Sequence, residues 1–161
     1  MSTTIRQASR SDLPALERLL RESFDASYAL FMPGAYVRGW RMSDEPARTL
    51  RRLLSDMGVA LSGEIPVGFI ACEAGSVAEL WVSPNHKRRG IGAALLGWAE
   101  DRLRDRGFDA VTLNCYERNT SALAFYRKMG FTVTARYPSR RVAGGPVTVF
   151  TMKKPLDARR G

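Results

Sequence analysis

Apolar residues recur at helical spacing in the first half of the chain. Residues 9–24 carry leucine and phenylalanine at intervals of three and four, which predicts a helix with one buried face. Residues 44–58 predict a second helix, which we expect Gly58 to end. Between them, residues 26–40 are rich in aromatic side chains and fit either a short helix or a loop.

Shorter apolar and β-branched runs, divided by Gly, Ser and Pro, predict strands. Residues 3–9 fit a strand before the first helix. After the second helix, strands are predicted at 58–63, 65–75 and 76–84, and a turn at 62–64 joins the first two as a hairpin. The pattern therefore changes from helical to extended near the middle of the chain.

The second half alternates helices and strands. The predicted elements are a helix at 90–107, a strand at 108–115, a helix at 119–130 and a final hairpin of strands at 131–137 and 146–154. A strand that follows a strand and a helix pairs in parallel, so 108–115 should lie beside 78–82. This order predicts an α+β fold with a mixed α/β sheet. No linker interrupts it, so we expect a single domain over 1–161, with 154–161 as a short basic tail.

The overall composition adds a strong positive charge. The chain has 161 residues with 25 Lys and Arg against 16 Asp and Glu, a net charge of +9. Such a charge fits an anionic partner, such as phosphate, nucleic acid or an acidic surface, and equally a basic surface that only contacts solvent. The basic residues are spread along the chain, so both interpretations stay open.

Several classes of protein are not indicated. No apolar run approaches the roughly 20 residues of a membrane span, and the first residues have no apolar signal core, so we expect a cytoplasmic protein. Cys72 and Cys115 lie in apolar runs and are expected to be buried thiols. With His86 as the single histidine, we expect no metal site.

A glycine-containing loop raises the question of a phosphate site. Gly90 and Gly92 follow the basic residues 87–89 and open the helix predicted at 90–107. They lack the spacing of a Walker loop and the third glycine of a dinucleotide-binding loop. Backbone N–H groups at a helix start can still bind a pyrophosphate, and glycine lets them approach it. The alternative is a glycine helix start next to a solvated basic loop.

Two motifs together resemble the GCN5-related N-acetyltransferase (GNAT) family. The first is the run Lys87-Arg88-Arg89-Gly90-Ile91-Gly92, in which lysine departs from the family's usual Gln or Arg. The second is formed by Asn119, Ala122, Phe125, Tyr126, Gly130 and Phe131. The resemblance covers about residues 65–135 by motif and the whole chain by element order.

The resemblance implies a splayed central sheet that binds acetyl-CoA. The pyrophosphate would lie on N–H groups between Arg88 and Ala93, and the pantetheine arm along the exposed backbone of Leu80, Trp81 and Val82. The full set of implied cofactor-binding residues is Leu80, Trp81, Val82, Lys87, Arg88, Arg89, Gly90, Ile91, Gly92, Ala93, Asn119 and Tyr126. Asn119 can bind the cofactor, cap the helix that follows, or do both.

The implied reaction is a direct attack of an amine on the thioester in a ternary complex, without an acyl-enzyme. Tyr126 is the candidate acid for the leaving thiolate, or else a packing residue. Glu79 is the candidate base acting through water, or else a carboxylate that attracts a cationic substrate. The backbone N–H of Val82 is the candidate oxyanion donor. His86, Cys115 and Glu117 are not expected to take part in catalysis.

The acceptor is less well indicated. Residues 27–40 and 136–147 should form its pocket, and the aromatic residues among them fit an apolar or cation-binding cleft. Family members that acetylate protein N-termini often carry Glu where this chain has Asn114, which favours a small-molecule amine. A protein or peptide amine, a non-catalytic acyl-CoA sensor and a nucleic-acid-binding module are the alternatives. A homodimer through the C-terminal hairpin is also compatible.

Overall fold

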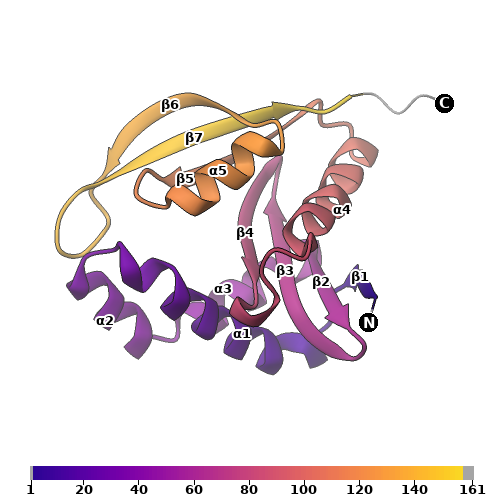
Figure 1. Cartoon of the computed structure of the whole chain (residues 1–161), viewed down its shortest axis with the longest axis horizontal. Helices are drawn as coiled ribbons and strands as arrows, with labels where there is room; N and C mark the ends of the chain where they lie inside the picture. Colours follow the sequence, from indigo (N-terminus) through magenta and orange to yellow (C-terminus); the bar gives the residue numbers. More distant parts are fainter. Residues whose placement is uncertain (1, 158–161) are drawn as a thin grey trace.

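The computed structural model describes residues 2–157 and contains a seven-stranded mixed sheet, in the order β1-β2-β3-β4-β5-β7-β6. The strands are β1 Thr3–Gln7, β2 Met57–Ser62, β3 Ile65–Glu73, β4 Ser76–Val82, β5 Ala110–Tyr116, β6 Thr132–Ser139 and β7 Val147–Pro155. The helices are α1 Leu13–Ala26, α2 Gly34–Met42, α3 Glu45–Leu53, α4 Ile91–Asp105 and α5 Thr120–Lys128. Figure 1 shows the helices packed against this sheet in two groups, α1 to α3 in one and α4 and α5 in the other.

The pairing of the strands confirms the predicted mixed sheet. β1 to β4 pair antiparallel, as do β5, β7 and β6, and β4 with β5 is the parallel pair. The crossover between β4 and β5 is α4, as expected for a βαβ unit. The last strand along the chain, β7, lies between β5 and β6.

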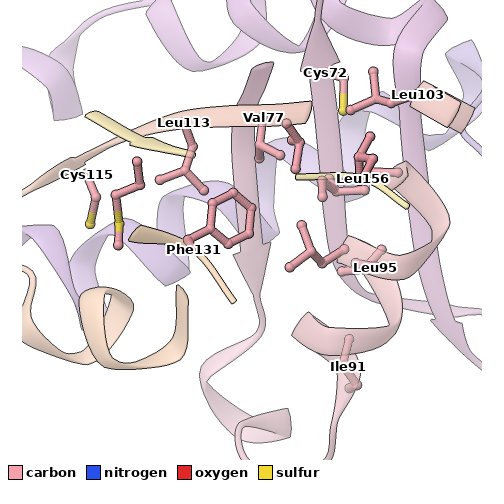
Figure 2. Close-up of a cluster of buried hydrophobic side chains, with 14 of the residues drawn as sticks. Cys72, Val77, Ile91, Leu95, Leu103, Leu113, Cys115, Phe131 and Leu156 are labelled. Carbon is pink, nitrogen blue, oxygen red and sulfur yellow. The ribbon is translucent and has the colours of Figure 1, made fainter. Parts of the chain in front are cut away.

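Two apolar clusters fill the two faces of the sheet, because strand side chains alternate. On β3, Ile70 and Cys72 pack with α4 and α5, whereas Phe69 and Ala71 pack with α1, α2 and α3. Figure 2 shows the first cluster, which includes Ile91, Leu95 and Leu103 of α4 together with Leu113 and Cys115 of β5. The sheet is thus covered by helices on both faces.

Gly58 has a different role from the predicted one. α3 ends at Leu53, a 3-10 turn covers Leu54–Asp56, and Gly58 lies inside β2. A Cβ atom on Gly58 would lie 2.7 Å from the ring of Trp98 on α4. The prediction that Gly58 ends the helix is therefore wrong, since this glycine makes room for an indole.

The remaining boundaries differ in smaller ways. Residues 26–40 form a short 3-10 helix, Tyr28–Leu30, followed by α2, so both open interpretations were partly right. Of the predicted tail, Lys154 and Pro155 belong to β7 and Leu156 is buried, while residues 158–161 lie outside the described residues. No helix in the described part of the chain is both long and apolar enough to cross a membrane.

Candidate active site

The parallel strands β4 and β5 separate after a short contact. They pair only at Ser76 with Thr112 and at Val77 with Leu113. Across β3, the register of β4 shifts between Val77 and Glu79, which leaves Ala78 as the extra residue of a β-bulge. Bulges bend a strand and increase its twist, so β4 turns away from β5 at this point. The predicted parallel pairing with 78–82 is right in direction but ends just before those residues.

The separation leaves one edge of β4 open along Leu80 and Val82. Antiparallel pairs alternate, and the backbone N–H of Ser83 donates to the Val67 carbonyl at 2.8 Å. Leu80 and Val82 therefore direct their backbone groups away from β3, toward the slot between β4 and β5. The Val82 carbonyl accepts a hydrogen bond from the Ser23 hydroxyl of α1 at 3.3 Å, which anchors the strand.

Trp81 differs from its two neighbours on β4. By the same alternation its backbone groups point toward β3, where it faces Phe69. Its indole packs with the apolar cluster under α1 to α3 and lines a cavity there. Of the three residues implied to bind the pantetheine arm, Leu80 and Val82 thus offer backbone groups to the slot, and Trp81 offers a side chain to the cavity.

The loop before α4 has an unusual backbone. Arg88 has φ of +63° and Gly90, the N-cap of α4, has φ of +79°. A left-handed conformation is uncommon for a residue such as arginine and tends to occur at functional sites. A Cβ on Gly90 would meet nothing within 4 Å, so glycine is required here by backbone conformation and not by crowding.

The start of α4 has the features of an anion site. α4 is 15 residues long, and the backbone N–H of Ala94, which bonds to Gly90 at 3.0 Å, is the first donor used by the helix. The N–H groups of residues 91–93 are therefore directed outward at the positive end of the dipole. Lys87, Arg88 and Arg89 are exposed beside them. These residues fit a pyrophosphate.

Gly92 also brings two helices together. A Cβ on Gly92 would lie 3.3 Å from the ring of Phe125 on α5. Phe125 in turn packs against Tyr126, with ring centroids 5.3 Å apart. Gly92, in the first turn of α4, thus allows the close approach of the helix that carries Tyr126.

His86 ends a 3-10 turn, Pro84–His86, just before this loop. It lines a cavity of about 310 Å³ together with Thr3, Ser62, Arg89 and Gly90. Its buried Nδ1 atom has no hydrogen-bond partner among the described residues. The cavity lies at the start of α4, and neither Glu79 nor Tyr126 lines it.

A cavity of about 270 Å³ opens where β4 and β5 separate. Its aromatic walls are Phe24, Tyr28, Tyr36, Trp40, Trp81 and Tyr116, and its carboxylates are Glu45 and Glu79. No Lys, Arg or His is among the described residues that line it. In a chain with net charge +9 this is a local reversal of sign.

Glu79 is held at the wall of this cavity. The indole Nε1 of Trp81 donates to its carboxylate at 2.5 Å. Burial raises the pKa of Glu79 to about 7, with a smaller upward effect from the charge of Glu45 and opposing effects from the Trp81 hydrogen bond and Arg52. A carboxyl group with this pKa exchanges protons near neutral pH.

Tyr126 on α5 does not line the cavity, but it lies within electrostatic reach of Glu79. Burial raises the pKa of its hydroxyl, and the nearby Cys115 and Glu79 raise it further. Its ring packs on Phe131, with centroids 5.6 Å apart, so packing and chemistry use the same side chain. Tyr126 is thus a neutral phenol, able to donate a proton.

The other predicted residues take structural positions. The Asn119 side chain caps α5 by accepting from the N–H of Ala122 at 3.3 Å. Burial raises the pKa of the Cys115 thiol to about 11, so it is not a ready nucleophile. Glu117 pairs with Arg136 at 3.2 Å. Asn114 accepts from the Thr151 hydroxyl at 3.0 Å and lines the aromatic cavity.

Of the two predicted acceptor segments, residues 27–40 contribute to the lining of the cavity and residues 136–147 do not. Tyr28, Tyr36 and Trp40 line it, whereas Met32 is buried in the core and Phe31 packs on Tyr28 and Tyr116. Four further contributions to the site were not predicted from the sequence: Glu45, Tyr116, Ser23 and the side chain of Trp81. Glu45 and Ser23 lie on helices where an isolated polar residue carries no signal, and only the fold places them together.

The comparisons with known proteins agree with this geometry. Residues 13–131 match the model of the Acetyltransferase (GNAT) family. The chain belongs to the GNAT family. Acetyl-CoA is the co-substrate of this family, and the chain is a GNAT-type N-acetyltransferase, as the two motifs predicted.

Two relatives of this acetyltransferase match over most of their own length. The spermidine N(1)-acetyltransferase of Thermoplasma acidophilum is 27% identical over 83% of this chain and 90% of its own length. The peptidyl-lysine N-acetyltransferase YjaB of Salmonella typhimurium is 30% identical over 84% and 88%. The crystal structure of the PaiA N-acetyltransferase from Thermoplasma acidophilum in complex with coenzyme A has a TM-score of 0.79 and 25% identity, covering 96% of this chain and 99% of that one.

Proposed function

We propose that this acetyltransferase transfers the acetyl group of acetyl-CoA to the primary amine of a small molecule. One observation carries the proposal: Glu79 lines the aromatic cavity where β4 and β5 separate, and its charge reaches the Tyr126 hydroxyl on α5. The helix start would hold the pyrophosphate, the open edge of β4 the pantetheine, and the cavity the amine.

Glu79 would act first. With a pKa of about 7 it is ionised in a large fraction of molecules at neutral pH and accepts a proton from the ammonium, directly or through water. The neutral amine then forms a bond to the thioester carbon. The Val82 N–H, directed into the slot, would donate to the developing oxyanion.

Tyr126 would complete the transfer. When the carbon–sulfur bond breaks, its hydroxyl donates a proton to the leaving thiolate, which yields coenzyme A as a thiol. The nitrogen of the new amide loses its second proton, which restores the phenol through solvent. Each step conserves charge and protons, and the chain forms no covalent bond to the acetyl group.

Loop contacts beside the cavity favour a small acceptor. A Cβ on Gly144, in the loop between β6 and β7, would lie 2.7 Å from Pro33. Val142 of the same loop is buried among the apolar residues of α1 and α2, and Figure 1 shows this loop reaching toward α2. Arg118 donates to the Phe31 carbonyl at 3.4 Å. These contacts join the β6–β7 loop and the β5–α5 loop to the segment before α2. We expect them to limit the room for a large acceptor.

A lysine side chain of a peptide is the second candidate acceptor. One relative is named as a peptidyl-lysine acetyltransferase and another as a spermidine acetyltransferase. The acceptor in each name, a lysine side chain or spermidine, carries an alkyl amine. Asn114 stands where members that acetylate protein N-termini often carry glutamate, so an α-amine acceptor is less favoured.

A thiol-release assay over amines, lysine peptides and aminoglycosides tests the proposal. We expect acetyl-CoA turnover with at least one small amine, and mass spectrometry should show one acetyl group on its nitrogen. Turnover restricted to peptides would replace the small molecule by the peptide acceptor. Binding of acetyl-CoA without turnover on any amine would contradict an enzymatic role.

A further inference from the structure

The charge distribution around the aromatic cavity carries a further inference about the acceptor. At least nine of the 16 acidic side chains of this basic protein form salt bridges with nearby cations. In the described part of the chain, salt bridges join Asp12, Glu17, Asp25, Asp44, Asp56, Glu73, Glu100, Asp101 and Glu117 to Arg or Lys.

The two carboxylates at the cavity are not among these paired residues. Neither Glu45 nor Glu79 has a salt bridge within residues 2–157, although arginines are abundant around them. Glu45 has Arg48 and Arg52 on its own helix, but Arg48 pairs with Asp44 and Arg52 with Glu73. Among the described residues, the two cavity carboxylates thus have no cation in direct contact.

The two carboxylates also lie within electrostatic reach of each other. The charge of Glu45 contributes to raising the pKa values of Glu79, Tyr36 and Tyr116, which line the cavity with it. Glu45 is exposed at the first turn of α3, whereas Glu79 lies deeper on β4. The cavity therefore has one carboxylate near the reacting centre and one at its mouth.

The walls between these two ends suit an alkyl chain with cationic groups. Tyr28 lies 4.9 Å from the Trp81 ring and 5.6 Å from the Tyr116 ring, measured between centroids. Aromatic faces attract ammonium groups and pack well on methylenes. An anionic substrate would meet two carboxylates and no cation among the described residues that line the cavity.

We propose that the acceptor is an alkyl diamine or polyamine, whose second ammonium group binds Glu45. This rests on the proposed acetyl transfer and names its substrate class. The reacting nitrogen gives its proton to Glu79 and attacks the thioester, while the distal nitrogen stays protonated at Glu45. A lysine side chain carries a single ammonium group, so it would pair with Glu79 and leave Glu45 without a partner from the substrate.

Two isosteric amines test the proposal. Putrescine and n-pentylamine have the same number of non-hydrogen atoms, but one ends in an ammonium and the other in a methyl group. We expect kcat/KM to be about threefold to fivefold higher for putrescine, as one exposed ion pair would give. In Glu45→Gln this ratio should fall toward one, whereas Glu64→Gln, an exposed change in the β2–β3 turn, should keep it.

The outcomes distinguish the diamine proposal from the proposed function. Equal kcat/KM values for the two amines, or an equal loss for both in Glu45→Gln, would overturn the diamine proposal while leaving acetyl transfer intact. A lysine peptide that outperforms putrescine and is insensitive to Glu45→Gln would also overturn it. Absence of turnover with every amine would instead contradict the proposed function.

Discussion

The indole Nε1 of Trp81 donates a hydrogen bond to the carboxylate of Glu79, two residues earlier on β4, at 2.5 Å. Residues two apart on a strand share a face, so the strand itself aligns donor and acceptor. The bond favours the ionised carboxylate, whereas burial favours the protonated one and has the larger effect. The balance sets a pKa of about 7, which suits a base working near neutral pH.

Removing the indole donor should shift the pH dependence of the reaction. In Trp81→Phe the ionised carboxylate loses its hydrogen bond, so the pKa of Glu79 rises and the acidic limb of kcat/KM moves to higher pH. In Glu79→Gln the part of that limb near pH 7 should disappear, because the group that titrates there is gone. The measurement is kcat/KM against pH for the three proteins. An unshifted limb in both variants would show that water alone receives the proton.

Glu79 should also cost stability when it is ionised. Its pKa is raised from 4.5 to about 7, so the folded state holds the proton more tightly than the unfolded chain does. The protonated Glu79 carboxyl stabilises the folded state fully below its unfolded pKa of 4.5. This stabilisation is lost as the pH rises through the folded pKa of about 7. Above that window, Glu79→Gln should raise the free energy of unfolding by on the order of 2 kcal/mol.

Denaturant unfolding of the parent protein and of Glu79→Gln, once below pH 4.5 and once above pH 7, checks the direction of this effect. Below the ordinary pKa of a glutamate the two should be equally stable, since both side chains are then neutral. A Glu79→Gln variant that is less stable than the parent at alkaline pH would contradict an energetic cost of burying the ionised carboxylate.

Tyr126→Phe should remove the acid and keep the packing. The ring still contacts Phe125 and Phe131, so the stability should change little. We expect kcat to fall by about a hundredfold, typical for loss of general acid catalysis. The rise in melting temperature that acetyl-CoA produces should be the same in both proteins. An unaltered kcat would assign the protonation of the thiolate to solvent.

The glycine at the start of α4 offers a matched pair of substitutions. Gly90 and Gly107 have φ values of +79° and +87°, and a Cβ atom added to either would meet nothing within 4 Å. Alanine at either site should cost about 1 kcal/mol of stability through backbone strain. Only Gly90→Ala should weaken acetyl-CoA binding, by roughly tenfold, because only Gly90 shapes the N–H groups of the loop.

Calorimetric titration of acetyl-CoA into the two variants makes the comparison. Equal losses of affinity would show that the effect comes from general destabilisation. Unaltered affinity in both would move the pyrophosphate away from this helix start.

The sequence predicted the element order well, because the apolar periodicities are strong and Gly107 and Gly130 follow the ends of α4 and α5. It also led to Gly90, Gly92, Asn119 and Tyr126, whose spacing is a motif in itself. That residues 1–161 form one domain stays a prediction. The error at Gly58 has a physical cause: a glycine that accommodates Trp98 looks the same in sequence as one that ends a helix.

The acceptor site was less predictable, since it depends on contacts between distant segments. Glu45 and Tyr116 lie far apart in sequence and meet only because β4 bulges at Ala78 and leaves β5. The negative charge of the cavity in this basic protein likewise depends on which carboxylates form salt bridges with arginine. Such pairings follow from the fold and leave no local pattern in the sequence.

A crystal structure of the protein with coenzyme A tests the central claim most directly. We expect the pyrophosphate within hydrogen-bond distance of the N–H groups of residues 88–93, the pantetheine amides on the open edge of β4, and the sulfur next to the Tyr126 hydroxyl. A coenzyme bound elsewhere, with the slot between β4 and β5 filled by side chains, would contradict this claim.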